Sequence, residues 1–87
     1  MQNKITLKHL AAEIAGWYGA LAILAAYTLV SFNMVASDGL AFQLLNLTGA
    51  LGVLVISLYK KVGQSVVLNI FWAGVALIAI LAILGTL

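Results

Sequence analysis

The chain of 87 residues contains no cysteine and no proline, and only four basic and two acidic side chains. Without cysteine it has no disulfide framework, no thiolate metal site and no thiol nucleophile. Without proline it has no proline kink and no proline-rich linker. Charged residues make up 7% of the chain and apolar residues 66%, whereas soluble domains carry about 25% charged residues. The composition therefore predicts that the lipid bilayer surrounds most of the chain.

The sequence also lacks the residue sets on which catalysis and nucleic-acid binding depend. Its net charge of +2 is small and scattered, which does not indicate a nucleic-acid partner. It has no Ser/His/Asp set, no paired carboxylates, no phosphate-binding loop and no metal-ligand cluster. His9 stands alone in a polar segment, where we expect it to be solvated. We therefore expect no enzyme, no metal and no cofactor.

Three long apolar runs predict three membrane-spanning helices. The first run, from Leu10 to Phe32, carries Glu13 as its only charge and would reach roughly 35 Å as a helix, enough to cross a hydrocarbon core of roughly 30 Å. It is longer than the ~7–15 apolar residues of a signal peptide, so we expect a helix rather than a cleaved leader. The predicted helices cover about residues 10–33, 39–59 and 65–86, in one domain over residues 1–87.

Two short polar breaks separate the three runs. Ser37 or Asp38 is expected to cap the second helix and Ser65 the third, while Gly63 is expected to end the second in a left-handed conformation. Connections of about four or five residues would place consecutive helices antiparallel and adjacent. The predicted fold class is therefore an all-α membrane protein, with three transmembrane helices in an up-down-up bundle.

The basic residues predict the orientation in the membrane. They precede the first helix or follow the second, which places all of them on one side: Lys4, Lys8, Lys60 and Lys61. The opposite side carries Asp38. The positive-inside rule therefore predicts a multi-pass protein of the inner (plasma) membrane, with the N-terminus in the cytoplasm and the C-terminus outside. An aromatic belt at the cytoplasmic headgroups would then contain Trp17, Tyr18 and Tyr59.

Small residues recur at spacings of three and four, which favours close helix contacts in lipid. They are Ala12, Ala15, Gly16, Gly19, Ala22 and Ala26 in the first helix, Thr48, Gly49 and Gly52 in the second, and Ala73, Ala76 and Ala79 in the third. These stripes serve either packing within the chain or contact with a partner subunit. The first helix is the preferred candidate for a subunit seam.

A few polar residues at membrane depth are candidates for function. Asn46 and Tyr27 lie at similar depths in neighbouring helices, so a hydrogen bond between them is geometrically open, whereas Asn69 and Trp72 lie in the third helix. Each amide needs a partner in hydrocarbon. Either the asparagines join helices, or they face a cavity and bind a small polar solute. Glu13 is expected to form an interfacial ion pair with His9 or the lysines, or else to couple protons or bind substrate.

The motif LNLTGA (residues 45–50) and the motif SVVLNIFW (residues 65–72) follow a first helix with Gly16, Gly19, Ala26 and Tyr27. Over about residues 14–84 this pattern resembles an uncharacterised bacterial family of small three-helix integral membrane proteins. Gln64 stands where that family has a proline. The resemblance implies the same three-helix fold.

The positions of Ser37, Gly49, Gly52 and Asn69 are more distantly similar to the PQ-loop group and its SemiSWEET half-transporters. This resemblance implies a SemiSWEET-like triple-helix bundle that forms a homodimer, with Asn69 and Trp72 facing the substrate. Residues 31–33 lack the Pro-Gln hinge of that group, and the basic connection here is the second rather than the first.

Three functions are compatible with these patterns. The first is a homodimeric half-transporter that passes a small polar solute by alternating access, with Asn69, Trp72, Asn46 and Tyr27 as substrate-binding residues. The second is a non-catalytic accessory or scaffold protein that packs against a larger membrane partner. The third is binding of anionic lipid headgroups by Lys60 and Lys61.

Overall fold

The computed structural model describes residues 6–86, which form three α-helices and no strand. They are α1 (Leu7–Ser31), α2 (Leu40–Lys60) and α3 (Gly63–Ile83). All three are long and apolar enough to cross a membrane. The predicted fold class is confirmed, and each helix boundary lies within about three residues of the predicted one.

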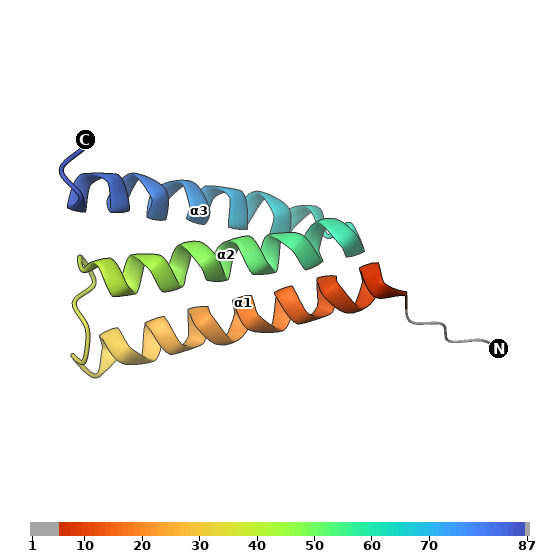
Figure 1. The fold of residues 1–87 in the computed structure, drawn as a ribbon, viewed down its shortest axis with the longest axis horizontal. Coiled ribbons are helices and arrows are strands. Elements are labelled where there is room, and N and C mark those ends of the chain that lie inside the picture. Colours follow the sequence, from red (N-terminus) through yellow and green to blue (C-terminus); the bar gives the residue numbers. More distant parts are fainter. Residues whose placement is uncertain (1–5, 87) are drawn as a thin grey trace.

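The three helices lie side by side with α2 in the middle (Figure 1). The helix α2 packs against both α1 and α3, but no Cα atom of α1 lies within 8 Å of one in α3. Consecutive helices run antiparallel, as the up-down-up prediction requires. The three helices therefore form an open layer, in which α1 and α3 both pack against α2 but do not contact each other.

The connections differ from those expected. The first covers residues 32–39 and the second only residues 61–62, where four or five each were predicted. Lys61, not Gly63, takes the left-handed conformation (φ 59°, ψ 45°), and the N–H of Val62 donates to the carbonyl of Ser57 at 2.9 Å. Gly63 is then free to begin α3.

The predicted helix caps are also wrong. Gly39, in an extended conformation, precedes α2, and no side chain caps that helix, so neither Ser37 nor Asp38 does so. Val62 precedes α3, which places Ser65 inside the first turn rather than before it. The short second connection explains this shift, because it starts α3 two residues earlier than the sequence pattern indicated.

Glycines bring α1 and α2 into backbone contact. A Cβ atom added to Gly52 would lie 3.1 Å from the Cα of Gly19, and one added to Gly49 would lie 3.0 Å from the carbonyl oxygen of Gly19. The small stripe of α1 is buried in this seam: Ala12, Gly16, Gly19, Ala22 and Ala26. This stripe therefore serves packing within the chain, whereas the subunit seam expected on the first helix stays a prediction.

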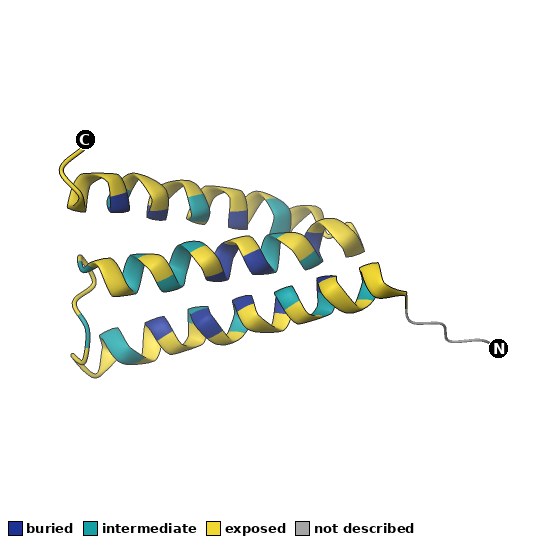
Figure 2. Cartoon of the chain, viewed as in Figure 1, coloured by how far each residue is buried: buried dark blue, intermediate teal, exposed yellow. Residues whose placement is uncertain are grey.

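Burial follows the pattern expected in lipid rather than in water (Figure 2). Among the described residues, the buried apolar side chains are alanines and Ile80. Large side chains point outward instead, including Trp17 (66% exposed) and Tyr27 (72% exposed). A water-soluble chain would bury such side chains, whereas membrane helices associate through small residues.

Candidate functional site

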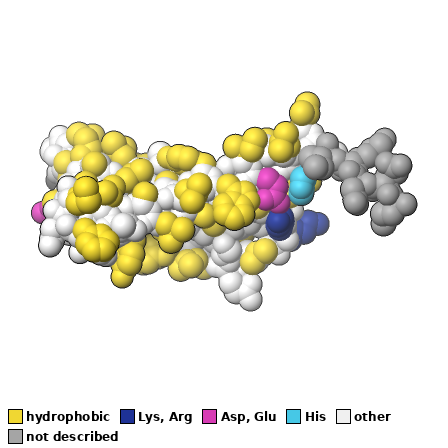
Figure 3. All heavy atoms as spheres, turned by 90° about the horizontal axis from the view of Figure 1, so that it is seen from below, with side chains coloured by type: hydrophobic (Ala, Val, Ile, Leu, Met, Phe, Trp, Pro, Cys, Tyr) yellow, Lys and Arg dark blue, Asp and Glu magenta, His cyan; other side chains and the backbone are white. Residues whose placement is uncertain are grey.

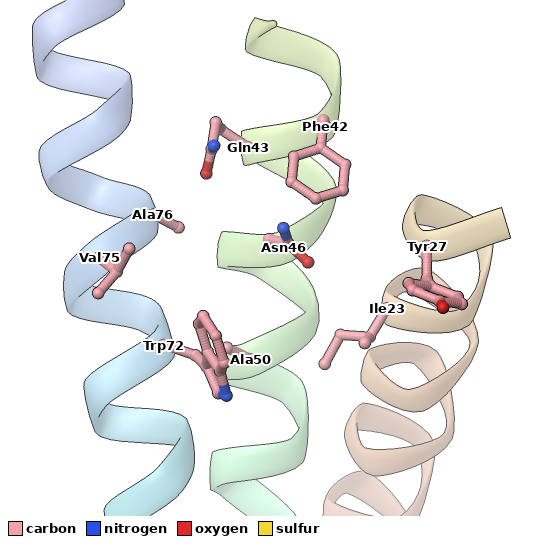
Figure 4. A pocket seen from close by; sticks show the side chains of 9 residues that line it. All are labelled: Ile23, Tyr27, Phe42, Gln43, Asn46, Ala50, Trp72, Val75 and Ala76. Carbon is pink, nitrogen blue, oxygen red and sulfur yellow. The ribbon is translucent and has the colours of Figure 1, made fainter. Parts of the chain in front are cut away.

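A groove lies between α1 and α3, and α2 forms its floor (Figure 4). Its volume is about 370 Å³. We call it the Asn46 groove after the polar residue at its centre. It is lined by Ile23, Tyr27, Phe42, Gln43, Asn46, Ala50, Trp72, Val75 and Ala76. The groove exists because α1 and α3 do not meet above α2.

Three of the four residues predicted to bind a solute line this one groove. Tyr27 comes from the second-last turn of α1, Asn46 from the second turn of α2, and Trp72 from near the middle of α3. The groove thus extends from the middle of the helices toward the end that carries the first connection. The fourth residue, Asn69, does not line it.

The Asn46 amide has no hydrogen-bond partner among residues 6–86. Its side chain is half-buried, and its amide group lies on the groove side of α2, between the walls that carry Trp72 and Tyr27 (Figure 4). None of the described side-chain polar atoms is both fully buried and unpartnered, so this amide is open to the groove. The hydrogen bond considered between Tyr27 and Asn46 is not formed.

Gln43 was not predicted as part of the site. Its Nε2 donates to the carbonyl oxygen of Ser37 at 3.1 Å, which ties the first connection to the groove end of α2. The spacing of Gln43, Asn46 and Ala50 places them on one face of α2. This spacing was the sequence signal from which Gln43 could have been assigned to the site. All polar groups that line the groove are uncharged: two amides, a phenol and an indole.

Asn69 belongs to a separate polar cluster between α2 and α3. Its Nδ2 donates to the Ser65 carbonyl at 2.8 Å and lies 3.2 Å from the Ser65 hydroxyl, which in turn lies 2.6 Å from the Ser57 hydroxyl. Ser57 and Asn69 are 4% and 5% exposed. Ser65, expected as a cap, thus joins the two helices. Both hydrogen bonds of Asn69 stay within α3, so Asn69 supports Ser65 and does not itself bond across to α2.

A charged cluster joins α1 to α2 at the opposite end from the groove. The Nζ of Lys60 lies 2.8 Å from a carboxylate oxygen of Glu13, and the Nε2 of His9 lies 3.9 Å from the same oxygen. The rings of His9 and Tyr59 are tilted against each other with centroids 5.5 Å apart, so His9 is packed rather than simply solvated. Figure 3 shows these basic, acidic and histidine side chains gathered at one end of the molecule.

Tyr18 lies deeper than the aromatic belt in which we expected it. Its hydroxyl lies 2.6 Å from the Thr48 hydroxyl, near the middle of both helices. Thr48 itself donates to the Leu44 carbonyl at 2.8 Å. Because a hydroxyl has one proton, Tyr18 is the donor to Thr48. Within residues 6–86, no group of three or more His, Cys, Asp or Glu side chains is placed to hold a metal ion.

The three apolar helices, with small side chains buried between them and large apolar side chains exposed, define a small multi-pass membrane protein. A protein-family model matches residues 12–86, and the chain belongs to that family. No curated protein and no solved structure gives a significant match. The matched range agrees with the small-family resemblance seen over about residues 14–84, whereas the likeness to the PQ-loop group stays a prediction.

Proposed function

We propose that the chain is one half of a membrane-embedded path for a small uncharged polar solute, and that a second copy completes the path. The Asn46 amide carries this proposal, because it faces the groove without a partner in residues 6–86. An unsatisfied amide in hydrocarbon costs several kcal/mol, of the order of 2–7. A solute that donates and accepts hydrogen bonds would satisfy it.

The size and lining of the groove favour a small solute. Ligand pockets have volumes of about 300–1,000 Å³ and combine apolar walls with a few polar groups, and the Asn46 groove has about 370 Å³. The rings of Tyr27 and Trp72 would provide flat walls beside the amide.

A single chain leaves the path open on one side, because α1 and α3 do not meet. A second copy that faces the groove would enclose it and keep the solute away from lipid. The backbone contact at Gly19 and Gly52 holds α1 and α2 as one unit. We therefore place the rocking motion of alternating access between the two copies rather than within the seam of α1 and α2.

Solute flux into proteoliposomes tests the role of Asn46. The probes are urea, glycerol and glucose, and the readout is vesicle swelling followed by light scattering. Asn46→Leu should abolish any flux that the wild-type chain supports, while helix content is retained. The matched control, Asn69→Leu, should retain flux in the folded fraction. Equal flux in Asn46→Leu and wild type would remove the assigned role of the groove.

Cross-linking tests whether two copies face each other through the groove. The chain has no cysteine, so a single introduced thiol reports one position. Val75 lines the groove, whereas Ile78 is exposed and does not line it, so Val75→Cys is the test and Ile78→Cys the control. A short bis-maleimide should give dimers with Val75→Cys and not with Ile78→Cys. The accessory function predicts the opposite: no self-cross-link at Val75, and no flux.

A further inference from the structure

A second groove lies on the other flank of the seam between α1 and α2. It has a volume of about 410 Å³ and is lined by Lys8, Ala11, Ala12, Val55, Leu58 and Tyr59. The flank opposite to it carries Glu13, Trp17, Val53 and Lys60. We call the second groove the Lys8 groove. It is separate from the Asn46 groove, with which it shares no residue.

The charges at this end of the molecule leave Lys8 without a carboxylate partner. Glu13 pairs with Lys60 at 2.8 Å, and no carboxylate of residues 6–86 lies within 4 Å of the Lys8 ammonium. The other described acid, Asp38, precedes α2 and lies at the far end. Among the described residues, this end of the molecule therefore carries three lysines and one glutamate. In the Lys8 groove, a lysine without a carboxylate partner in residues 6–86 therefore lies beside an apolar surface.

Apart from Lys8 and Tyr59, the residues that line the Lys8 groove are apolar. The α1 side of the groove is formed by Ala11, which is exposed, and Ala12, which is only 4% exposed. Val55 and Leu58 form the α2 side. Alanines leave room here that larger side chains would fill. Tyr59 borders the groove, and its ring is held against that of His9.

We infer that the Lys8 groove binds one anionic phospholipid, with its phosphate at Lys8 and the start of an acyl chain along Ala11 and Val55. Basic grooves between membrane helices bind acidic headgroups, because the charge attracts the phosphate while the helix surface receives the chain. A free phosphate would use only the lysine and would leave the apolar floor uncovered. The sequence pattern suggested Lys60 and Lys61 for lipid binding, but Lys60 is engaged by Glu13.

Native mass spectrometry of the full chain in mild detergent tests the headgroup part of this inference. The probes are phosphatidylglycerol and phosphatidylcholine with identical acyl chains, and the readout is the fraction of protein that retains one lipid. Wild type should prefer phosphatidylglycerol. Because a lysine near the surface contributes about 1 kcal/mol to anionic-lipid binding, Lys8→Gln should lower that preference about fivefold. The control Lys61→Gln removes the same charge outside the groove and should lower it less.

The acyl-chain part needs a variant that keeps every charge. Ala11→Leu fills the exposed floor of the groove, and Ala25→Leu makes the same change at an exposed position of α1 outside it. Only Ala11→Leu should lower lipid retention, and circular dichroism should show equal helix content in both. Glycerol 3-phosphate, which has no acyl chain, should not compete. Equal losses in Lys8→Gln and Lys61→Gln, competition by glycerol 3-phosphate, or equal retention in Ala11→Leu and wild type would overturn the inference.

Discussion

Glu13 of α1 and Lys60 of α2 form an ion pair of 2.8 Å at the end of the molecule that also holds Lys8 and Lys61. The pair closes the seam at the helix ends, where the glycine contacts of Gly19 and Gly52 no longer reach. Both side chains are partly exposed, at 28% for Glu13 and 52% for Lys60. The structure thus gives Glu13 a partner that joins two helices, in line with the expected interfacial ion pair.

Removing either member of this pair should lower the thermal stability by a small amount. We expect Glu13→Gln and Lys60→Gln each to lower the Tm in detergent, and the double variant to lose less than the sum of the two, because the second change removes nothing more. The losses should shrink in ~1 M salt, where screening acts over about 3 Å. Strictly additive losses in the double-mutant cycle would contradict the pairing.

The glycine seam should tolerate no added methyl group. Gly52→Ala places a Cβ 3.1 Å from the Cα of Gly19 and 3.2 Å from its amide nitrogen, so the two backbones must separate. Such overpacking typically costs about 1–3 kcal/mol. Gly74→Ala is the matched control, because a Cβ there has nothing within 4 Å, and it should be neutral or stabilise the helix by up to about 1 kcal/mol. Unfolding in a denaturing detergent measures both.

The sequence could predict this seam because the physics of lipid leaves few choices. Helices of this apolarity cannot be held by hydrophobic burial, so small residues at helical spacing must mark the contacts. The stripe of α1 from Ala12 to Ala26 is buried as that principle requires. The caps were not predictable in the same way, since Lys61 adopts a left-handed conformation that sequence rules reserve for glycine.

The site was only partly predictable for a related reason. Depth along a helix can be counted from the sequence, so Tyr27 and Asn46 were placed at similar depths, whereas the position of Trp72 in the same groove was not predicted. The direction of each side chain depends on helix rotation, which the sequence of a uniformly apolar helix hardly constrains. Asn69 accordingly turned toward Ser65 rather than into the groove. The gap between α1 and α3 that forms the groove is a tertiary feature with no local signal.

The hydroxyl contact of Tyr18 with Thr48 should contribute little to stability. Hydrogen bonds between membrane helices average about 0.6 kcal/mol, and Thr48 keeps its bond to Leu44 when the tyrosine hydroxyl is removed. We therefore expect Tyr18→Phe to cost about 0.6 kcal/mol and Thr48→Val about the same, with strong non-additivity in the double variant. A loss well above 2 kcal/mol for Tyr18→Phe would mean that the hydroxyl has another role.

The two asparagines should respond in opposite ways to replacement by leucine. Asn69→Leu removes the hydrogen bonds to Ser65 in a buried cluster and should destabilise the fold by about 1–2 kcal/mol. Asn46→Leu removes an amide without a partner in residues 6–86 and should leave the stability unchanged or higher. Unfolding of both variants, without added solute, gives the comparison. Equal destabilisation would show that Asn46 is bonded within the protein or its dimer.

The left-handed backbone of Lys61 predicts a stabilising change in the second connection. A non-glycine residue at φ 59° carries a strain of about 1–2 kcal/mol, whereas glycine loses about 0.5–1 kcal/mol of additional chain entropy on folding. The net gain for Lys61→Gly should therefore be about 0.5–1 kcal/mol.

The proper reference for this gain is Lys61→Ala rather than the wild-type chain. Both variants lose the favourable lysine charge at the end of α2, but only alanine keeps the Cβ that causes the strain. Asn33, the other described non-glycine residue with positive φ, serves as a second control. Asparagine tolerates this conformation better than lysine does, so Asn33→Gly should gain less over Asn33→Ala than Lys61→Gly gains over Lys61→Ala. Equal stability of Lys61→Gly and Lys61→Ala in thermal unfolding would show that the turn relaxes away from the left-handed conformation.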